Sequence, residues 1–202
     1  MAILKIARMG HPVLKARAAE IEDPGAPEVA ALTADMLETM ADAEGLGLAA
    51  PQVHVSKRLV IFRIPPSGTE DDDRDDAEDF PVLALINPVV EPLTDDLALG
   101  WEGCLSVPGL RGLVPRFAEV RYTGVTAEGT PIETVAEGLH ARVVQHECDH
   151  LDGVLYPMQM DDLSMLVFES EWKHRMAAEQ DTPKADPAAE TDDQDVTLER
   201  AS

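Results

Sequence analysis

The pentapeptide His146-Glu-Cys-Asp-His150 constrains the fold of this chain more than any other part of its sequence. On an α-helix each residue turns by about 100°, so side chains four positions apart leave nearly the same face. His146 and His150 can therefore bind one metal ion if this stretch is helical. Glu147 then lies close enough to exchange a proton with a water on that ion. The pattern predicts a metal-binding helix, and the alternative is a helix with two unrelated surface histidines.

The helix around this motif has recognisable limits. We expect it to run from about residue 138 to 151, with Gly153 after its end. Cys148 lies two residues from His146, which turns its side chain about 200° away from the first ligand. We therefore expect Cys148 to be a small buried side chain and not a ligand.

A catalytic metal site usually has three protein ligands and one open position, so the third ligand decides the class of enzyme. The long zinc-protease signature would require a histidine at position 156, where this chain has Tyr156, and that interpretation fails. A downstream glutamate, Glu169 or Glu171, could serve as in thermolysin-like proteases. Cys104 offers a thiolate, which is a strong ligand for zinc or ferrous iron. The residues alone leave the glutamates and Cys104 open.

The rest of the chain predicts an α+β fold, with antiparallel or mixed β-sheets packed around the central metal-binding helix. The expected strands form hairpins and short pieces and do not alternate with helices, which disfavours a doubly wound parallel sheet. Helical spacing of apolar residues predicts helices over 27–44 and 161–178, and short β-branched runs predict strands over 58–64 and 82–90. Residues 118–126 and 131–136 flank Glu128-Gly129 and predict a hairpin.

The net charge of −23 is unevenly distributed. Residues 70–79 carry eight acids and one base, and residues 179–202 carry eight acids and two bases. We expect a single catalytic domain over 1–178, an acidic surface insertion at about 65–80, and a disordered tail over 179–202. An acidic surface predicts no direct binding to nucleic acid or to anionic membranes. Adaptation to high salt is a further hypothesis for this acidity.

The expected location is cytoplasmic. No apolar stretch approaches the length that crosses a bilayer, and the N-terminal residues lack the long apolar run of a secretory signal. The two cysteines, Cys104 and Cys148, argue against a disulfide-bonded scaffold and favour metal binding, catalysis or simple burial.

Three segments together resemble the signature motifs of the peptide deformylases. They are Gly45-Leu-Gly-Leu-Ala-Ala-Pro-Gln52, Glu102-Gly-Cys-Leu-Ser106 and Gln145-His-Glu-Cys-Asp-His150, in this order along the chain. Each segment alone is a weak or moderate signal, and the three in register are a strong one. The resemblance extends from about residue 3 to residue 170. It departs from the family where Cys148 replaces the usual aliphatic residue and where the acidic insertion lengthens one loop.

The resemblance implies hydrolysis of the formyl group from the N-terminal methionine of newly made proteins, with release of formate. It implies that Cys104, His146 and His150 hold a single ion, usually Fe2+, with Zn2+, Ni2+ or Co2+ in some preparations. Glu147 would be the catalytic carboxylate. The implied partner is an N-formylmethionyl peptide or nascent chain, with the ribosome exit region as a further candidate.

The reaction also requires donors for the oxyanion and a pocket for methionine. By resemblance, the Gln52 side-chain amide and the Leu105 backbone N–H are those donors. Arg111 would orient Glu102 or a substrate carbonyl, with an ordinary surface arginine as the alternative. His11, His54, His140 and His174 are not expected to be ligands. The residues expected to contact the substrate are Gly45, Leu46, Gly47, Glu102, Gly103, Leu139 and Val143.

Two other functional classes make different predictions. A thermolysin-like protease would keep its metal without Cys104 and would cut internal peptide bonds. A non-catalytic module with a structural ion would need a fourth protein ligand. Glu147 and Gln52 argue against that last class, because a purely structural site requires neither residue.

Overall fold

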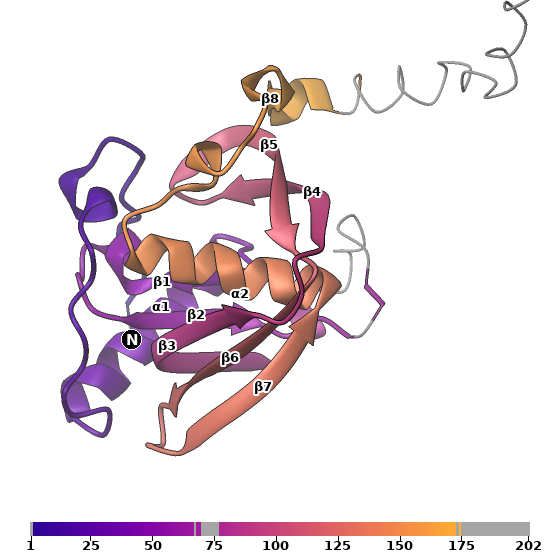
Figure 1. The fold of residues 1–202 in the computed structure, drawn as a ribbon. Helices are drawn as coiled ribbons and strands as arrows, with labels where there is room; N and C mark the ends of the chain where they lie inside the picture. Colours follow the sequence, from indigo (N-terminus) through magenta and orange to yellow (C-terminus); the bar gives the residue numbers. More distant parts are fainter. Residues whose placement is uncertain (1, 67, 70–76, 173, 175–202) are drawn as a thin grey trace, which may run out of the picture.

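A computed structural model describes residues 2–66, 68–69, 77–172 and 174. Two antiparallel sheets lie on either side of one buried helix, α2 (Figure 1). The larger sheet has the strand order β1-β2-β3-β6-β7, and the smaller has the order β4-β5-β8. The strands are β1 (Gly47–Ala49), β2 (Leu59–Arg63), β3 (Val82–Pro92), β4 (Leu97–Cys104), β5 (Val107–Phe117), β6 (Glu119–Thr126), β7 (Pro131–Glu137) and β8 (Leu166–Phe168). The α-helices are α1 (Pro27–Asp42) and α2 (Gly138–Leu151). The predicted α+β fold with a central helix is confirmed.

Short 3-10 helices complete the chain between these elements. They are η1 (Pro12–Lys15), η2 (Ala50–Val53), η3 (Ala77–Asp79), η4 (Tyr156–Met158) and η5 (Leu163–Met165). The predicted hairpin is confirmed as β6 and β7, which pair antiparallel from Val125↔Pro131 to Glu119↔Glu137.

Helix α2 has the limits that the sequence predicts. It begins directly after β7 and ends before Gly153, which has a φ of +77° and leaves no room for a Cβ against the backbone of Lys15. Most of its residues are buried, because one side packs on the larger sheet and the other on the smaller. The core on its larger-sheet side includes Val144, Cys148 and Leu151. The helix is therefore fixed on both sides, which fixes the side chains that it carries.

Helix α1 covers the opposite face of the larger sheet. Val29, Met36 and Met40 are buried there with Leu59 and Ile61 of β2, which confirms the expected apolar face of this helix. The alternate residues of β2 face α2. Every residue of β2 is buried, as expected for a strand covered on both faces.

The predicted helix over 161–178 is wrong in its first half. Residues 163–165 form η5, and Leu166–Phe168 form β8, which pairs antiparallel with Leu110–Gly112 of β5. α-Helical geometry begins only at residue 169. Backbone pairing with β5 therefore outweighs the helical spacing of the apolar residues in this segment. Residues 175–178, the predicted tail 179–202 and residues 70–76 of the insertion lie outside the described residues.

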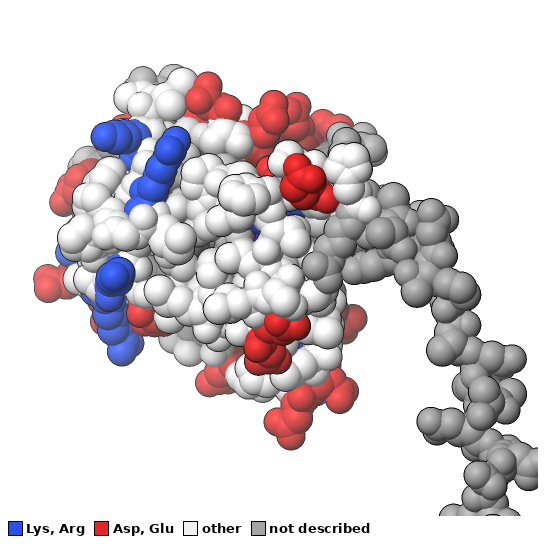
Figure 2. Space-filling model, turned by 90° about the horizontal axis from the view of Figure 1, so that it is seen from above, with Lys and Arg blue, Asp and Glu red and all other residues white. Residues whose placement is uncertain are grey.

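The acidic side chains spread around the margin of the face shown in Figure 2, and the lysines and arginines gather on one side of it. The centre of this face is largely uncharged (Figure 2). Within the described part of the chain, no helix is long and apolar enough to cross a membrane.

Candidate metal centre

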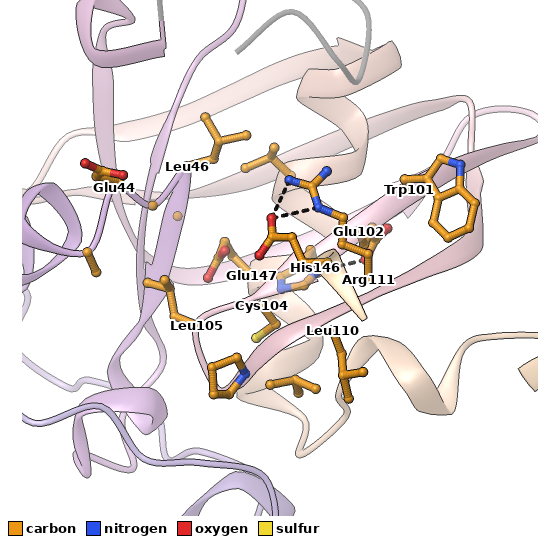
Figure 3. A pocket seen from close by; sticks show the side chains of 18 of the residues that line it. Glu44, Leu46, Trp101, Glu102, Cys104, Leu105, Leu110, Arg111, His146 and Glu147 are labelled. Atoms are coloured by element: carbon orange, nitrogen blue, oxygen red, sulfur yellow. Dashed lines mark hydrogen bonds and ion pairs between the residues drawn. The ribbon is translucent and has the colours of Figure 1, made fainter. Parts of the chain in front are cut away.

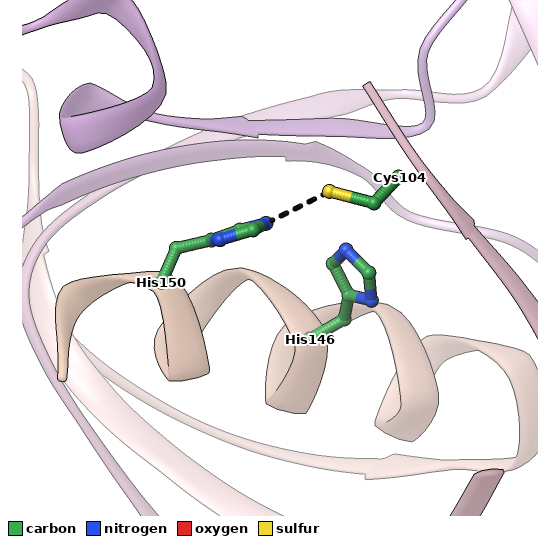
Figure 4. Close-up of side chains that lie close together, drawn as sticks. All are labelled: Cys104, His146 and His150. Atoms are coloured by element: carbon green, nitrogen blue, oxygen red, sulfur yellow. Dashed lines mark hydrogen bonds between the residues drawn. The ribbon is translucent and has the colours of Figure 1, made fainter. Parts of the chain in front are cut away.

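The side chains of Cys104, His146 and His150 converge on one point. One ligand atom from each residue lies within 4.8 Å of the others, and no further residue joins this group in the described part of the chain. Cys104 is the last residue of β4, and the two histidines rise from successive turns of α2 toward its sulfur (Figure 4). The Sγ of Cys104 lies 3.3 Å from the Nε2 of His150. Helix and strand therefore bring together three potential ligands that are far apart in sequence.

The spacing of these atoms fits an ion with tetrahedral coordination. Metal–sulfur and metal–nitrogen bonds of about 2.3 and 2.0 Å at a tetrahedral angle place the two ligand atoms about 3.5 Å apart. The observed 3.3 Å between Sγ and Nε2 agrees with that value. The Nδ1 of His146 is bonded to Glu102 at 2.8 Å, which leaves its Nε2 for the ion. Burial lowers the pKa of His150 well below its usual value, and this favours the neutral imidazole that binds metals.

Glu102 fixes the orientation of His146. Its carboxylate is 4% exposed and accepts a bidentate pair from Arg116 at 2.8 and 3.0 Å. Arg142 donates to the same carboxylate at 2.9 Å. Burial alone would raise the pKa of Glu102, but the hydrogen bonds and charges of His146 and Arg116 hold it well below its usual range. The carboxylate is therefore ionised and holds the imidazole through its Nδ1, as outer-shell carboxylates do at metal sites.

The downstream glutamates lie elsewhere. Glu169 pairs with Arg111, with N–O distances of 3.0 and 3.1 Å, and Glu171 is exposed. Neither belongs to the group of ligand atoms around His146. Tyr156 stacks on the ring of His146, with the ring centroids 6.3 Å apart, and belongs to the core. The geometry therefore supports Cys104 as the third ligand and gives no support to the glutamates.

Glu147 is buried beside the cluster. Its Oε2 has no hydrogen-bond partner within the described chain, and a Cβ on Gly47 would collide with its carboxylate. Burial raises the pKa of Glu147 to about 7. A carboxylate with a pKa near the working pH can both accept and return a proton, so Glu147 has the properties of a general base and acid.

The Gln52 amide lies next to the candidate ligand Cys104. Its Oε1 accepts a hydrogen bond from the Ala49 N–H at 2.8 Å, which fixes the amide. Its Nε2 lies 3.2 Å from the Ser106 hydroxyl and 3.6 Å from the Cys104 sulfur. Leu105 follows Cys104 directly in the turn between β4 and β5. Both predicted oxyanion donors therefore come from segments adjoining the cluster. The contact with Ser106 is one that the sequence did not indicate.

A cleft of about 490 Å³ opens over this cluster. Figure 3 shows Cys104, His146 and Glu147 near its centre, with Leu46 and Leu105 on one side and Trp101 and Arg111 on the other. All the residues expected to contact the substrate line it, namely Gly45, Leu46, Gly47, Glu102, Gly103, Leu139 and Val143.

Two expectations about charged residues change. Glu102 lines the cleft, but its carboxylate oxygens already bind His146, Arg116 and Arg142, so a positioning role fits better than contact with substrate. Arg111 does not orient Glu102, because its guanidinium pairs with Glu169. The register of the β4–β5 hairpin explains both results, and the sequence alone does not predict that hairpin.

The remaining histidines of the prediction behave as expected. His140 lies 3.3 Å from the Tyr122 hydroxyl, and His11 packs edge-on against His54 at a centroid distance of 4.7 Å. Neither these three residues nor His174 belong to the group of ligand atoms. Cys148 is buried in the core, and burial raises the pKa of its thiol, which confirms it as a packed side chain.

Comparison with known proteins identifies the relatives of this chain. The family described as Polypeptide deformylase matches residues 3–165. Peptide deformylase 1 of Bordetella pertussis is 56% identical over 160 residues, which cover 79% of this chain and 88% of the relative. A class I type b peptide deformylase from Acinetobacter baumannii, solved with Met-Ala-Ser bound, has a TM-score of 0.70 and 36% identity, covering 79% of this chain and 99% of that chain. Its actinonin-bound structure has a TM-score of 0.68 and 34% identity, covering 80% and 100%.

Proposed function

Because the chain belongs to the peptide deformylase family, we propose that Cys104, His146 and His150 hold its catalytic ion and that Glu147 transfers the protons of the reaction. The protein is an enzyme that hydrolyses the formyl group from N-formylmethionyl ends of proteins. The observation that carries the assignment of residues is the convergence of three ligand atoms within 4.8 Å, beside a buried carboxylate and under a cleft.

We propose Fe2+ as the ion in the cell, and the ligand set would equally accept Zn2+, Ni2+ or Co2+. One thiolate and two imidazoles suit these borderline ions better than they suit Mg2+ or Ca2+. When bound, such an ion polarises the formyl carbonyl and lowers the pKa of a water toward neutrality. The side of the cluster that faces the cleft is not occupied by Cys104 or the two histidines, so substrate can enter there.

Glu147 serves as base and then as acid in this proposal. It accepts a proton from the attacking water as the new C–O bond forms at the formyl carbon. It then returns that proton to the methionine nitrogen as the C–N bond breaks, which yields formate and a free amine. Its pKa of about 7 supports both transfers. Gly47 leaves the space in which the carboxylate sits.

The oxyanion that forms on the formyl oxygen requires hydrogen-bond donors. We assign this role to the Nε2 of Gln52 and the backbone N–H of Leu105, which adjoin the ligand cluster. The bond from Ala49 holds the Gln52 amide in a fixed orientation before substrate arrives. Loss of one such donor typically lowers the rate by about 10²- to 10³-fold.

The substrate would lie as an extended peptide along the edge of β1. Among the described residues this strand pairs only with β2, which leaves its other edge for a further strand. Gly45 and Gly47 allow a peptide backbone to approach that edge closely. Leu46, Leu139 and Val143 form an apolar wall of the cleft, and we assign the methionine side chain to it.

The proposed partner is the N-formylmethionyl end of a nascent chain. A relative has been solved with Met-Ala-Ser bound, which supports peptide binding in this cleft. We further propose that the enzyme acts in the cytoplasm near the ribosome exit region, where such ends emerge. Cosedimentation of the enzyme with ribosomes that carry formylated nascent chains, and not with empty ribosomes, would support this partner.

The test uses protein that is purified anaerobically and analysed for metal. The unmodified enzyme should release formate from formyl-Met-Ala. Glu147→Ala should keep the metal and lose turnover, whereas Cys104→Ala should lose the metal. Retention of full activity by Glu147→Ala, or retention of the metal by Cys104→Ala, would overturn the assignment. Cleavage of internal peptide bonds would instead indicate a protease.

A further inference from the structure

The C-terminal segment of the described chain forms part of the substrate cleft. β8 lies against β5 at the top of Figure 1, and Glu169 follows it directly in the chain. Glu169 lines the same cleft as Cys104 and His146 and is the part of this segment that reaches it. It has no role in the ligand cluster, so its position calls for another explanation.

Glu169 and Trp172 hold Arg111 between them. The Glu169 carboxylate accepts a hydrogen bond from the Nε of Arg111 at 3.1 Å and forms an ion pair with its Nη2 at 3.0 Å. The Cζ of Arg111 lies 4.7 Å from the centroid of the Trp172 ring, a cation–π arrangement. Trp172 also packs edge-on against Trp101, with a centroid distance of 6.3 Å. The side chain of Arg111 is only 17% exposed, so these contacts limit where its guanidinium can move.

The distance of Arg111 and Trp101 from Cys104 matches the distance from the formyl group to the substrate residues that follow methionine. Arg111 pairs in register with Gly103, the residue before the ligand Cys104. Trp101 lies three residues before Cys104 on the same strand, which is about 10 Å at ~3.4 Å per residue. An extended peptide covers about the same distance in three residues. A substrate with its formyl group at the cluster and its chain extended along β4 toward Trp101 would therefore bring its third residue to Trp101 and Arg111.

We propose that Glu169 and Trp172 are positioning residues that hold Arg111 at the outer end of the cleft, where Arg111 and Trp101 bind the third residue of the peptide. This inference rests on the proposed function, because it requires the formyl group at Cys104, His146 and His150. Arg111 keeps guanidinium N–H groups beyond the two given to Glu169, and they can donate to a peptide carbonyl. The C-terminal segment therefore determines how tightly the enzyme binds substrates longer than a dipeptide.

The test compares formyl-Met-Ala with formyl-Met-Ala-Ser-Ala on the metal-loaded full chain. Glu169→Gln should raise the KM for the longer peptide by roughly three- to fivefold more than for formyl-Met-Ala, the size expected for one partly exposed ion pair. Trp172→Ala should act in the same direction. The matched control is Glu171→Gln, since Glu171 is exposed on the same segment and outside the cleft. It should leave both KM values unchanged.

A double variant separates positioning from direct contact. In the Arg111→Ala background, Glu169→Gln should have no further effect on the longer peptide, because Glu169 acts through Arg111. Equal effects on both peptides, no effect on either, or additive effects in the double variant would each overturn the inference. Failure of the unmodified enzyme to release formate from formyl-Met-Ala would instead overturn the proposed function.

Discussion

Replacement of Glu102 by glutamine should destabilise the protein strongly. The substitution keeps the shape of the side chain but removes the charge that Arg116 and Arg142 face in a site where Glu102 is 4% exposed. Removal of one partner of a buried ion pair typically costs about 3–5 kcal/mol, because the other charge stays buried without compensation. In a domain of this size that loss lowers Tm by on the order of 10 °C.

The same substitution should weaken metal binding. Glu102 fixes His146 through Nδ1, and loss of such an outer-shell carboxylate typically lowers metal affinity by about 10- to 100-fold. Thermal unfolding of chelator-treated protein measures the change in stability without the contribution of the metal. Competition with a chromogenic chelator measures the affinity of each protein for the metal ion. Glu91→Gln is the matched control. Glu91 pairs with Arg121 at 3.9 Å on the exposed surface, where a pair contributes less than about 1 kcal/mol.

The pH dependence of this effect has a definite sign. The pKa of Glu102 is lower in the folded than in the unfolded chain, so its ionisation stabilises the fold above the usual carboxyl pKa. This contribution is lost as the pH falls through the acid range toward the folded pKa. The difference between the unmodified protein and Glu102→Gln should therefore be full at pH 7 and narrow below about pH 4. A loss below 1 kcal/mol at pH 7, or one that does not change with pH, would refute the reasoning.

Three further predictions concern the same site. Gly47→Ala should lower kcat by about 10²-fold or more with the metal retained, because the new Cβ displaces the Glu147 carboxylate; normal turnover would contradict this. Cys148→Ala should cost about 1–2 kcal/mol in urea unfolding but leave metal content and formate release intact, and loss of the metal would show that Cys148 is a ligand. The kcat/KM for formyl-Met-Ala should fall as the pH decreases through the pKa of Glu147. Burial raises this pKa to about 7, and a bound cation lowers it. A rate that instead rises toward pH 5 would exclude Glu147 as the base.

The sequence predicted α2 better than any other element. Its limits follow from Gly138 and Gly153, and the spacing of His146 and His150 requires a helix. Because α2 is buried on both sides, its hydrophobic pattern is not needed to predict it. The spacing of the predicted ligands identifies the helix independently of that pattern. The third ligand could not be derived from spacing. Cys104 lies on another element, and only the three motifs together distinguished it from the downstream glutamates.

The β4–β5 hairpin could not be read from composition. Gly103, Gly109, Pro108 and Pro115 weaken the usual strand signal, and the pairing of the two strands overrides it. Without the register of this hairpin, the sequence does not predict the arginine partners of Glu102, which are Arg116 and Arg142 and not Arg111. The C-terminal strand β8 was missed for a similar reason, since it exists only by pairing with β5.

The proposed ligands of the metal centre join the smaller sheet to α2. Cys104 belongs to the smaller sheet, and it is separated by 46 residues from His150 on the helix. An ion held by both closes that loop much as a covalent cross-link would, and it reduces the entropy of any partly opened state. An ion that binds only the folded chain stabilises it by about 2.7 kcal/mol at 100 times its Kd, so we expect the supply of metal to affect how long the folded enzyme survives as well as its activity. We therefore expect the protein to be degraded faster in cells that are short of the ion.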